Sequence, residues 1–170
     1  GLQDLENGLK GLENKNYPHP IAFNCLPHID SFMENGYTKE EIKMIEETRK
    51  ILNKEDLRIT ATTVRVPIRH SHSISVNLEF EDEFTLDRVY EVLENTDGIV
   101  VQDNPSENLY PMPIYAEGTD DIYVGRIRKD FSIENGLNMW VVADNVRKGA
   151  ATNAIQIVEL LIRRDENDTI

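Results

Sequence analysis

Arginine and histidine side chains gather in one β-rich stretch, residues 62–80, which reads TTVRVPIRHSHSISVNLEF. A guanidinium can bind a carboxylate through two parallel hydrogen bonds, and an imidazole can transfer protons near neutral pH. Arg65 and His72 flank the short bend PIRH, which predicts a hairpin that brings both side chains together from adjacent strands. The alternative is structural: Arg65 pairs with one of the 31 acidic residues, and His72 packs in the core. The stretch alone leaves both interpretations open.

A metal ion is a second chemistry that this stretch could support, because His70 and His72 share one face of the predicted strand. Zinc sites use three or four ligands, and only His19 and His28 remain as further imidazoles. We therefore expect no metal site, and we interpret Arg69 and His70 as bend residues.

Cys25 is the single cysteine of the chain and a candidate nucleophile. A reactive thiolate needs a cation or a helix N-terminus beside it, whereas Cys25 stands among apolar residues in IAFNCLPHID. This context favours a small, buried and inert side chain. A single cysteine excludes a disulfide within the chain and fits a reducing compartment, so we expect a cytoplasmic protein.

Two further patterns carry charges that could bind a small anionic or zwitterionic ligand. Glu40 and Lys43 stand three residues apart in a predicted helix, where a plain surface ion pair is the alternative interpretation. The stretch VRKGAATN places two cations and several small residues at a helix start, which attracts anions or permits close helix packing.

The elements that would position these side chains follow from periodicity and from turn signals. Thr38 and Glu41 form a predicted capping box at the start of the clearest helix. The last helix should turn Ala151, Ala154, Ile155, Val158 and Leu161 inward. The expected helices contain Leu2, Leu5, Leu9 and Leu12, then residues 38–52, 85–95 and 145–164, and the expected strands are residues 59–66, 71–80, 99–101, 121–128 and 137–144.

This order of elements predicts one α+β domain of 170 residues, with a mixed, largely antiparallel sheet and helices packed on one face. The other face needs a cover, and a second subunit is one solution. The net charge of −13 disfavours nucleic acid as a partner, and no apolar run is long enough to span a membrane. The chain contains no Gly-rich dinucleotide or P-loop motif.

Five stretches together resemble the C-terminal domain of the bacterial aspartate-semialdehyde dehydrogenase family. In chain order they are YPHPIAFNCLPHID, NGYTKEEIKMIEETRKIL, TATTVRVPIRHSHSISV, YVGRIRKD and MWVVADNVRKGAATNAIQIVE. They extend over nearly all of the chain. The resemblance implies an NADP-dependent oxidoreductase that reduces β-aspartyl phosphate to aspartate semialdehyde and phosphate, a step that feeds lysine, diaminopimelate, threonine and methionine biosynthesis. It also implies a homodimer formed through this domain, with NADP bound mainly by a separate N-terminal Rossmann domain.

The same resemblance implies a role for each matching residue. Arg65 would hold the substrate carboxylate, Glu40 would face the substrate amino group, and Lys43 would face the phosphate. His72 would be the acid/base, and Asn145 would lie against the cofactor.

The chain also departs from the family pattern. The family nucleophile is a cysteine in an Asn-Cys-Ser/Thr motif, and neither that motif nor the family's substrate-orienting Gln-x-x-Ser-Gly-Ala-Gly stretch occurs here. Cys25 does not match that nucleophile, so we expect an isolated domain that is inactive alone. Two alternatives stay open: a domain of the related N-acetyl-γ-glutamyl-phosphate reductase, or a catalytically silent dimerisation module.

Overall fold

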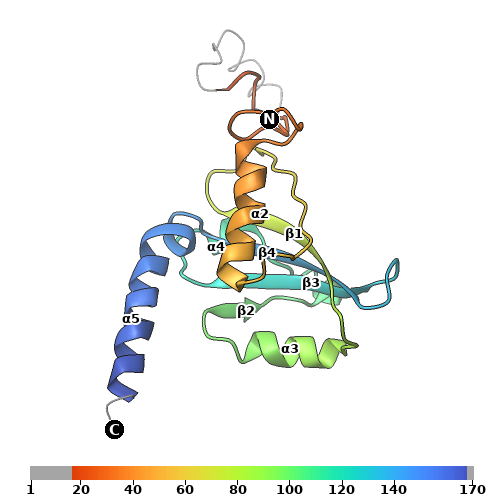
Figure 1. Ribbon diagram of the computed structural model, residues 1–170. Helices are drawn as coiled ribbons and strands as arrows, with labels where there is room; N and C mark the ends of the chain where they lie inside the picture. Colours follow the sequence, from red (N-terminus) through yellow and green to blue (C-terminus); the bar gives the residue numbers. More distant parts are fainter. Residues whose placement is uncertain (1–16, 168–170) are drawn as a thin grey trace. The chain divides into compact units, whose positions relative to one another are not determined.

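The computed structural model describes residues 17–167, with side chains through residue 162, and it divides the chain into two compact units (Figure 1). Unit 1 is Gly1–Pro67 and unit 2 is Ile68–Ile170. The helix predicted from Leu2, Leu5, Leu9 and Leu12 lies outside the described residues.

Unit 1 is organised around the helix α2, Lys39–Leu52. Its start confirms the predicted capping box: Thr38 accepts the amide proton of Glu41, and the Glu41 carboxylate accepts the amide proton of Thr38. These reciprocal bonds satisfy two amides that the first helical turn leaves without partners. Asn53 then ends the helix in the left-handed conformation, with its amide bonded to the carbonyls of the last turn.

The predicted strand over residues 59–66 is wrong. This segment is extended, but its one ladder contact within the described residues is an isolated bridge between Arg65 and Leu26. A strand needs a partner along its whole length, and alternating residue types cannot show whether such a partner exists. The predicted hairpin is wrong with it, because the strand that contains His72 pairs with a different segment.

Unit 2 contains a four-stranded sheet with the order β1-β4-β3-β2. The strands are β1 (His72–Glu79), β2 (Ile99–Val101), β3 (Ile122–Asp130) and β4 (Gly136–Ala143). β4 runs antiparallel to both β1 and β3, whereas β2 runs parallel to β3. This sheet confirms the predicted α+β class with a mixed, largely antiparallel sheet.

One face of the sheet packs against α3, Leu86–Glu94, which runs alongside β2 (Figure 1). Val124, Ile127 and Leu137 are the buried centre of this packing, and apolar residues of α3 close around them. The Tyr90 hydroxyl donates a 2.7 Å hydrogen bond to Asp103. Burial, together with this bond, raises the pKa of Tyr90 to about 12 and keeps the phenol neutral as a fixed anchor of the helix.

The other face is covered locally by the segment between β2 and β3. It contains a 3₁₀ turn, Pro105–Glu107, and the one-turn helix α4, Pro113–Ala116. The Trp140 indole donates to the Pro111 carbonyl at 3.1 Å. A side chain at Gly125 would collide with the Gln102 carbonyl and with the Pro111 ring, so only glycine permits this close approach.

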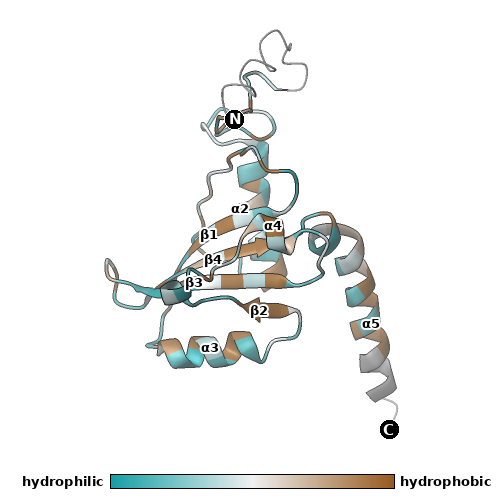
Figure 2. Cartoon of the chain, turned by 180° about the vertical axis from the view of Figure 1, so that it is seen from behind, coloured by the Kyte–Doolittle hydropathy of each residue, from teal (hydrophilic) through white to brown (hydrophobic). Residues whose placement is uncertain are grey.

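The closing helix departs from its predicted packing. A π-helical turn, Arg147–Ala151, with non-helical backbone at Ala150, precedes α5, Thr152–Asn167. Ala151 and Ala154 are exposed, and Ile155, Val158 and Leu161 are each more than half exposed, so the expected inner face is not buried. Figure 2 shows apolar residues along β2, β3 and β4 and on several turns of α5.

The strand β1 lies within one residue of its predicted bounds, 71–80, but its burial does not alternate along the strand, and one of its faces is incompletely covered. Ile74, Leu78 and Phe80 keep 44%, 36% and 42% of their surface exposed. These three residues, with Val76, are named here the β1 apolar face. Within residues 17–167, no helix is long and apolar enough to cross a membrane.

Candidate functional site

Arg65 in unit 1 is fixed at both its backbone and its side chain. Its amide and carbonyl bond to Leu26 at 2.8 and 2.9 Å, and its guanidinium lies 5.1 Å from the centre of the Tyr17 ring. No ion pair joins Arg65 to an acidic side chain among residues 17–162, which leaves the predicted alternative of a structural ion pair unsupported. A guanidinium that stacks on an aromatic ring keeps its hydrogen-bonding edge available for a carboxylate.

Glu40 and Lys43 lie on the first turns of α2, with 3.6 Å between Oε1 of Glu40 and Nζ of Lys43. Their side chains are 34% and 54% exposed, so this is a surface ion pair of small energetic value. Such a weak pair can exchange its internal contact for contacts to a charged ligand, because little stability is lost when it opens.

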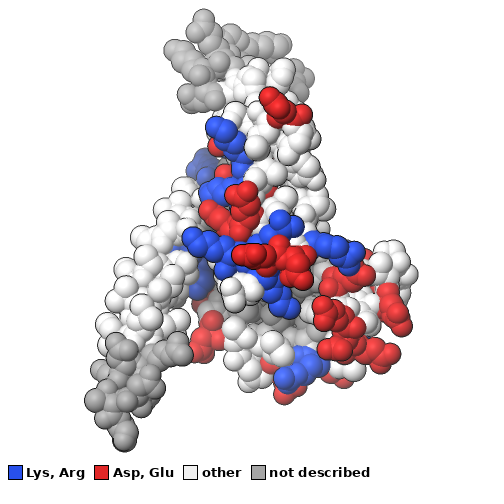
Figure 3. All heavy atoms as spheres, viewed as in Figure 1, with Lys and Arg blue, Asp and Glu red and all other residues white. Residues whose placement is uncertain are grey.

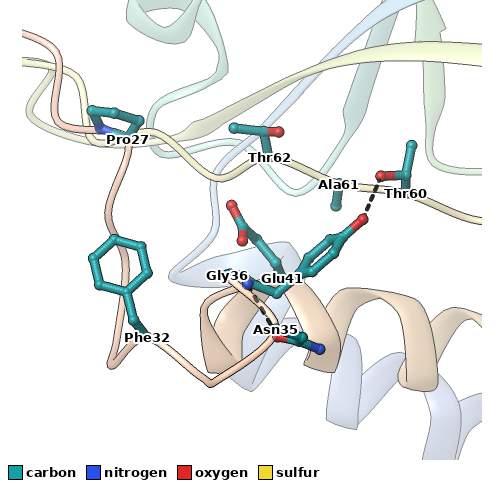
Figure 4. Close-up of a pocket in the computed structure, with 9 residues that line it drawn as sticks. Pro27, Phe32, Asn35, Gly36, Glu41, Thr60, Ala61 and Thr62 are labelled. Carbon is teal, nitrogen blue, oxygen red and sulfur yellow. Dashed lines mark hydrogen bonds between the residues drawn. The ribbon is translucent and has the colours of Figure 1, made fainter.

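A pocket of about 340 Å³ lies near the start of α2 (Figure 4). Its walls come from the loop before α2, from the first turn of α2 and from the extended segment opposite. They consist of Pro27, Phe32, Asn35, Gly36, Tyr37, Glu41, Thr60, Ala61 and Thr62. None of the residues predicted to bind substrate lines this pocket.

Glu41 has a second role that the sequence did not reveal. Besides its capping bond to the Thr38 amide at 2.8 Å, its carboxylate accepts the Thr63 amide proton at 2.9 Å. The hydrogen bonds from the two backbone amides, of which that from Thr38 has the larger effect, hold the pKa of Glu41 below its ordinary value. One carboxylate therefore fixes the segment that leads to Arg65 onto the helix that carries Glu40 and Lys43.

In unit 2, His72 is the first residue of β1, and it is exposed. The alternative prediction of a core histidine is therefore wrong. The register pairs His72 with Ala143, the last residue of β4. Because Asp144 and Asn145 follow Ala143 directly, His72 and Asn145 lie at the same end of two neighbouring strands.

Asp144, which was not among the predicted site residues, organises this end of the sheet. It is 4% exposed and accepts amide protons from Gly118 at 2.8 Å, Val146 at 2.9 Å and Arg147 at 3.4 Å. These hydrogen bonds, of which that from Gly118 has the largest effect, hold the pKa of Asp144 below its ordinary value. The available signal was an aspartate directly before a helical turn, the position where a side-chain oxygen commonly satisfies free amides.

The two cations of VRKGAATN are already engaged within unit 2. Arg147 forms a bidentate pair with Asp120 at 2.7 and 2.8 Å, and Lys148 donates to Gln156 at 2.7 Å. The hydrogen bond from Arg147 is the main cause of a pKa of Asp120 below its ordinary value. The suggested anion site at this helix start is therefore not supported.

Cys25 is exposed, which contradicts the expected buried thiol. Its amide bonds to the Asn24 side chain, and the loop turns through a left-handed residue at Phe23, so the apolar neighbours do not enclose the sulfur. Within the part of the chain that the structure describes, no three His, Cys, Asp or Glu side chains come together as a metal site.

Charge on the described surface is mixed on the face shown in Figure 3, where Lys and Arg side chains lie among Asp and Glu side chains. Among the described residues on that face, no continuous basic patch is present.

The α+β fold agrees with the comparison to known families. Residues 3–148 match the family described as semialdehyde dehydrogenase, dimerisation domain. The match covers most of the chain, so the chain belongs to the semialdehyde dehydrogenase dimerisation-domain family.

The individual relatives are aspartate-semialdehyde dehydrogenases. That of Aquifex aeolicus is 55% identical over 95% of this chain and 50% of its own length. The crystal structure of aspartate-semialdehyde dehydrogenase II from Vibrio cholerae, complexed with ASA, has 47% identity and a TM-score of 0.87 over 95% of this chain and 47% of its own. The Candida albicans enzyme with NADP has 25% identity and a TM-score of 0.67, over 85% of this chain and 46% of its own. The chain spans about half the length of the curated relatives it matches.

Proposed function

We propose that residues 1–170 are the substrate-binding and dimerisation domain of an aspartate-semialdehyde dehydrogenase. The complete enzyme would reduce β-aspartyl phosphate with NADPH, and an N-terminal Rossmann domain would provide most of the cofactor site. The observation that supports this proposal most strongly is the family match, which extends over the segments that contain all five predicted site residues.

Unit 1 would supply the ionic groups that recognise the substrate. Arg65 would donate two parallel hydrogen bonds to the α-carboxylate, because this side chain is held on Tyr17 and has no competing acid among the described residues. Glu40 would bind the α-ammonium group, and Lys43 would neutralise the phosphate. The weak ion pair between Glu40 and Lys43, 3.6 Å long, would open when the substrate binds, because both side chains would then contact the ligand instead.

Unit 2 would supply the acid/base and one contact to the cofactor. His72 is exposed at the end of β1, where its imidazole can accept a proton from, or donate one to, a bound substrate. The side-chain amide of Asn145 has no hydrogen-bond partner among residues 17–162, so it is free to contact NADPH, which would supply the hydride.

We propose that the β1 apolar face is part of a homodimer interface. Ile74, Leu78 and Phe80 are exposed on an edge strand, and a second subunit would remove them from water. Ile74→Lys should convert the dimer to monomers, whereas Ser75→Lys, on the opposite face of the same strand, should leave it intact. Sedimentation equilibrium checks both variants, and a wild-type chain that is monomeric at high concentration would contradict the proposal.

Ligand-induced stabilisation tests the substrate class. Aspartate semialdehyde at about 100 times its Kd should stabilise the protein by about 2.7 kcal/mol, which raises Tm by several degrees. The N-acetylated glutamate semialdehyde should give no shift, because it offers Glu40 no ammonium group. Stronger protection by the acetylated compound would support the glutamyl-phosphate reductase alternative, and a lack of protection by either compound would support a silent dimerisation module.

A further inference from the structure

The residue directly before His72 has an unusual backbone conformation. Ser71 has φ = 73°, in the left-handed region that residues with a Cβ atom seldom adopt. It is also 3% exposed, so the strained turn is enclosed by the surrounding structure. Strained residues that the fold holds in place are concentrated at functional sites, where the conformation is part of the mechanism.

Two contacts connect this turn to the segment around α4. The Ser71 hydroxyl donates to the Pro113 carbonyl at 3.3 Å, and the neighbouring His70 imidazole lies 3.4 Å from the Glu117 carboxylate. The Ser71 contact is longer than a strong hydroxyl hydrogen bond. The backbone conformation of Ser71, rather than its hydroxyl, is therefore the stronger constraint on the chain.

The same segment also fixes the neighbouring strand. Gly118, two residues after α4, donates its amide proton to the buried Asp144, which follows Ala143. Ala143 is the register partner of His72. The segment around α4 therefore contacts both the residues just before His72 and the residue just before Asn145, and it fixes the position of one relative to the other.

We infer that Ser71 is a positioning residue for His72: its left-handed turn sets the direction in which the chain enters β1 and so aims the imidazole. This inference rests on the proposed function only for the role of His72 in turnover. The turn geometry itself can be tested without any assay of activity.

Two substitutions separate the backbone from the hydroxyl. Ser71→Gly removes the hydroxyl but adopts the left-handed turn readily, whereas Ser71→Thr keeps the hydroxyl and adds a β-branch that disfavours this turn. In the full-length enzyme, the glycine variant should keep kcat within about threefold, and the threonine variant should lose about tenfold or more, with KM nearly unchanged in both. Ser75→Thr, the same change in the extended part of β1, is the control and should have no effect.

The NMR signals of the His72 ring in the 170-residue chain provide the second measurement. They should stay close to wild type in Ser71→Gly and shift in Ser71→Thr, while the dispersed amide signals of the sheet show that both variants fold. The reverse order, with threonine like wild type and glycine impaired, would overturn the inference. If the threonine variant does not fold, a glycine variant with displaced His72 signals would overturn it equally. Retained activity in a His72 variant would instead count against the proposed function. The NMR signals of the His72 ring would still show whether Ser71 positions that ring.

Discussion

Replacing His72 with asparagine should lower the turnover of the full-length enzyme by about two to four powers of ten, the usual contribution of a general acid or base. The expected loss is large because asparagine keeps a polar side chain of similar reach but cannot exchange protons near neutral pH. His72 is exposed at the first position of β1, so the substitution removes no core packing. Steady-state kinetics should show the loss in kcat, with KM for the substrate changed little.

His70→Asn is the matched control for this prediction. His70 stands two residues earlier and is about half exposed, and its imidazole lies 3.4 Å from Glu117. The same substitution there should change turnover by less than about threefold, because surface ion pairs contribute little. A loss of less than threefold in the His72 variant, or an equal loss in both variants, would refute the acid/base assignment.

Local signals in the sequence predicted the elements whose stability is largely local. The capping box at Thr38 and Glu41 defines the start of α2, and the alternation of apolar residues with serine and asparagine indicates β1. These signals depend on backbone hydrogen bonds and side-chain alternation within a few residues. They place Glu40, Lys43 and His72 on the correct elements.

The errors share one physical cause, which is that the partner of a segment is not encoded in that segment. Residues 59–66 have the composition of a strand, but only Arg65 finds a ladder partner, Leu26. Cys25 has apolar neighbours in sequence, yet the turn at Phe23 and the hydrogen bond from the Cys25 amide to the Asn24 side chain leave the thiol exposed. The apolar residues of α5 repeat at helical spacing, but nothing within the described part of unit 2 buries them.

The residues that sequence reasoning missed are buried polar groups with distant partners. Asp144 binds the Gly118 amide across 26 positions, and Glu41 binds the Thr63 amide across 22. Ser71 adopts a backbone conformation that no local motif requires. Such groups are costly to bury unless the fold supplies partners, so their significance becomes visible only when the fold is known.

Replacing Arg65 with lysine should lower kcat/KM for the substrate by about 10- to 100-fold, because charged hydrogen bonds contribute about 1.5–3 kcal/mol each. Lysine keeps the positive charge but cannot grip a carboxylate with two parallel hydrogen bonds or stack a planar group on Tyr17. The loss should fall on substrate use, and KM for NADPH should change by less than about twofold, because Arg65 is assigned to the carboxylate alone. Arg69→Lys is the matched control, since Arg69 is exposed in the bend before β1 and has no assigned contact. Wild-type kcat/KM in the Arg65 variant, or an equal rise in KM for NADPH, would show that a bidentate guanidinium is not what binds the substrate carboxylate.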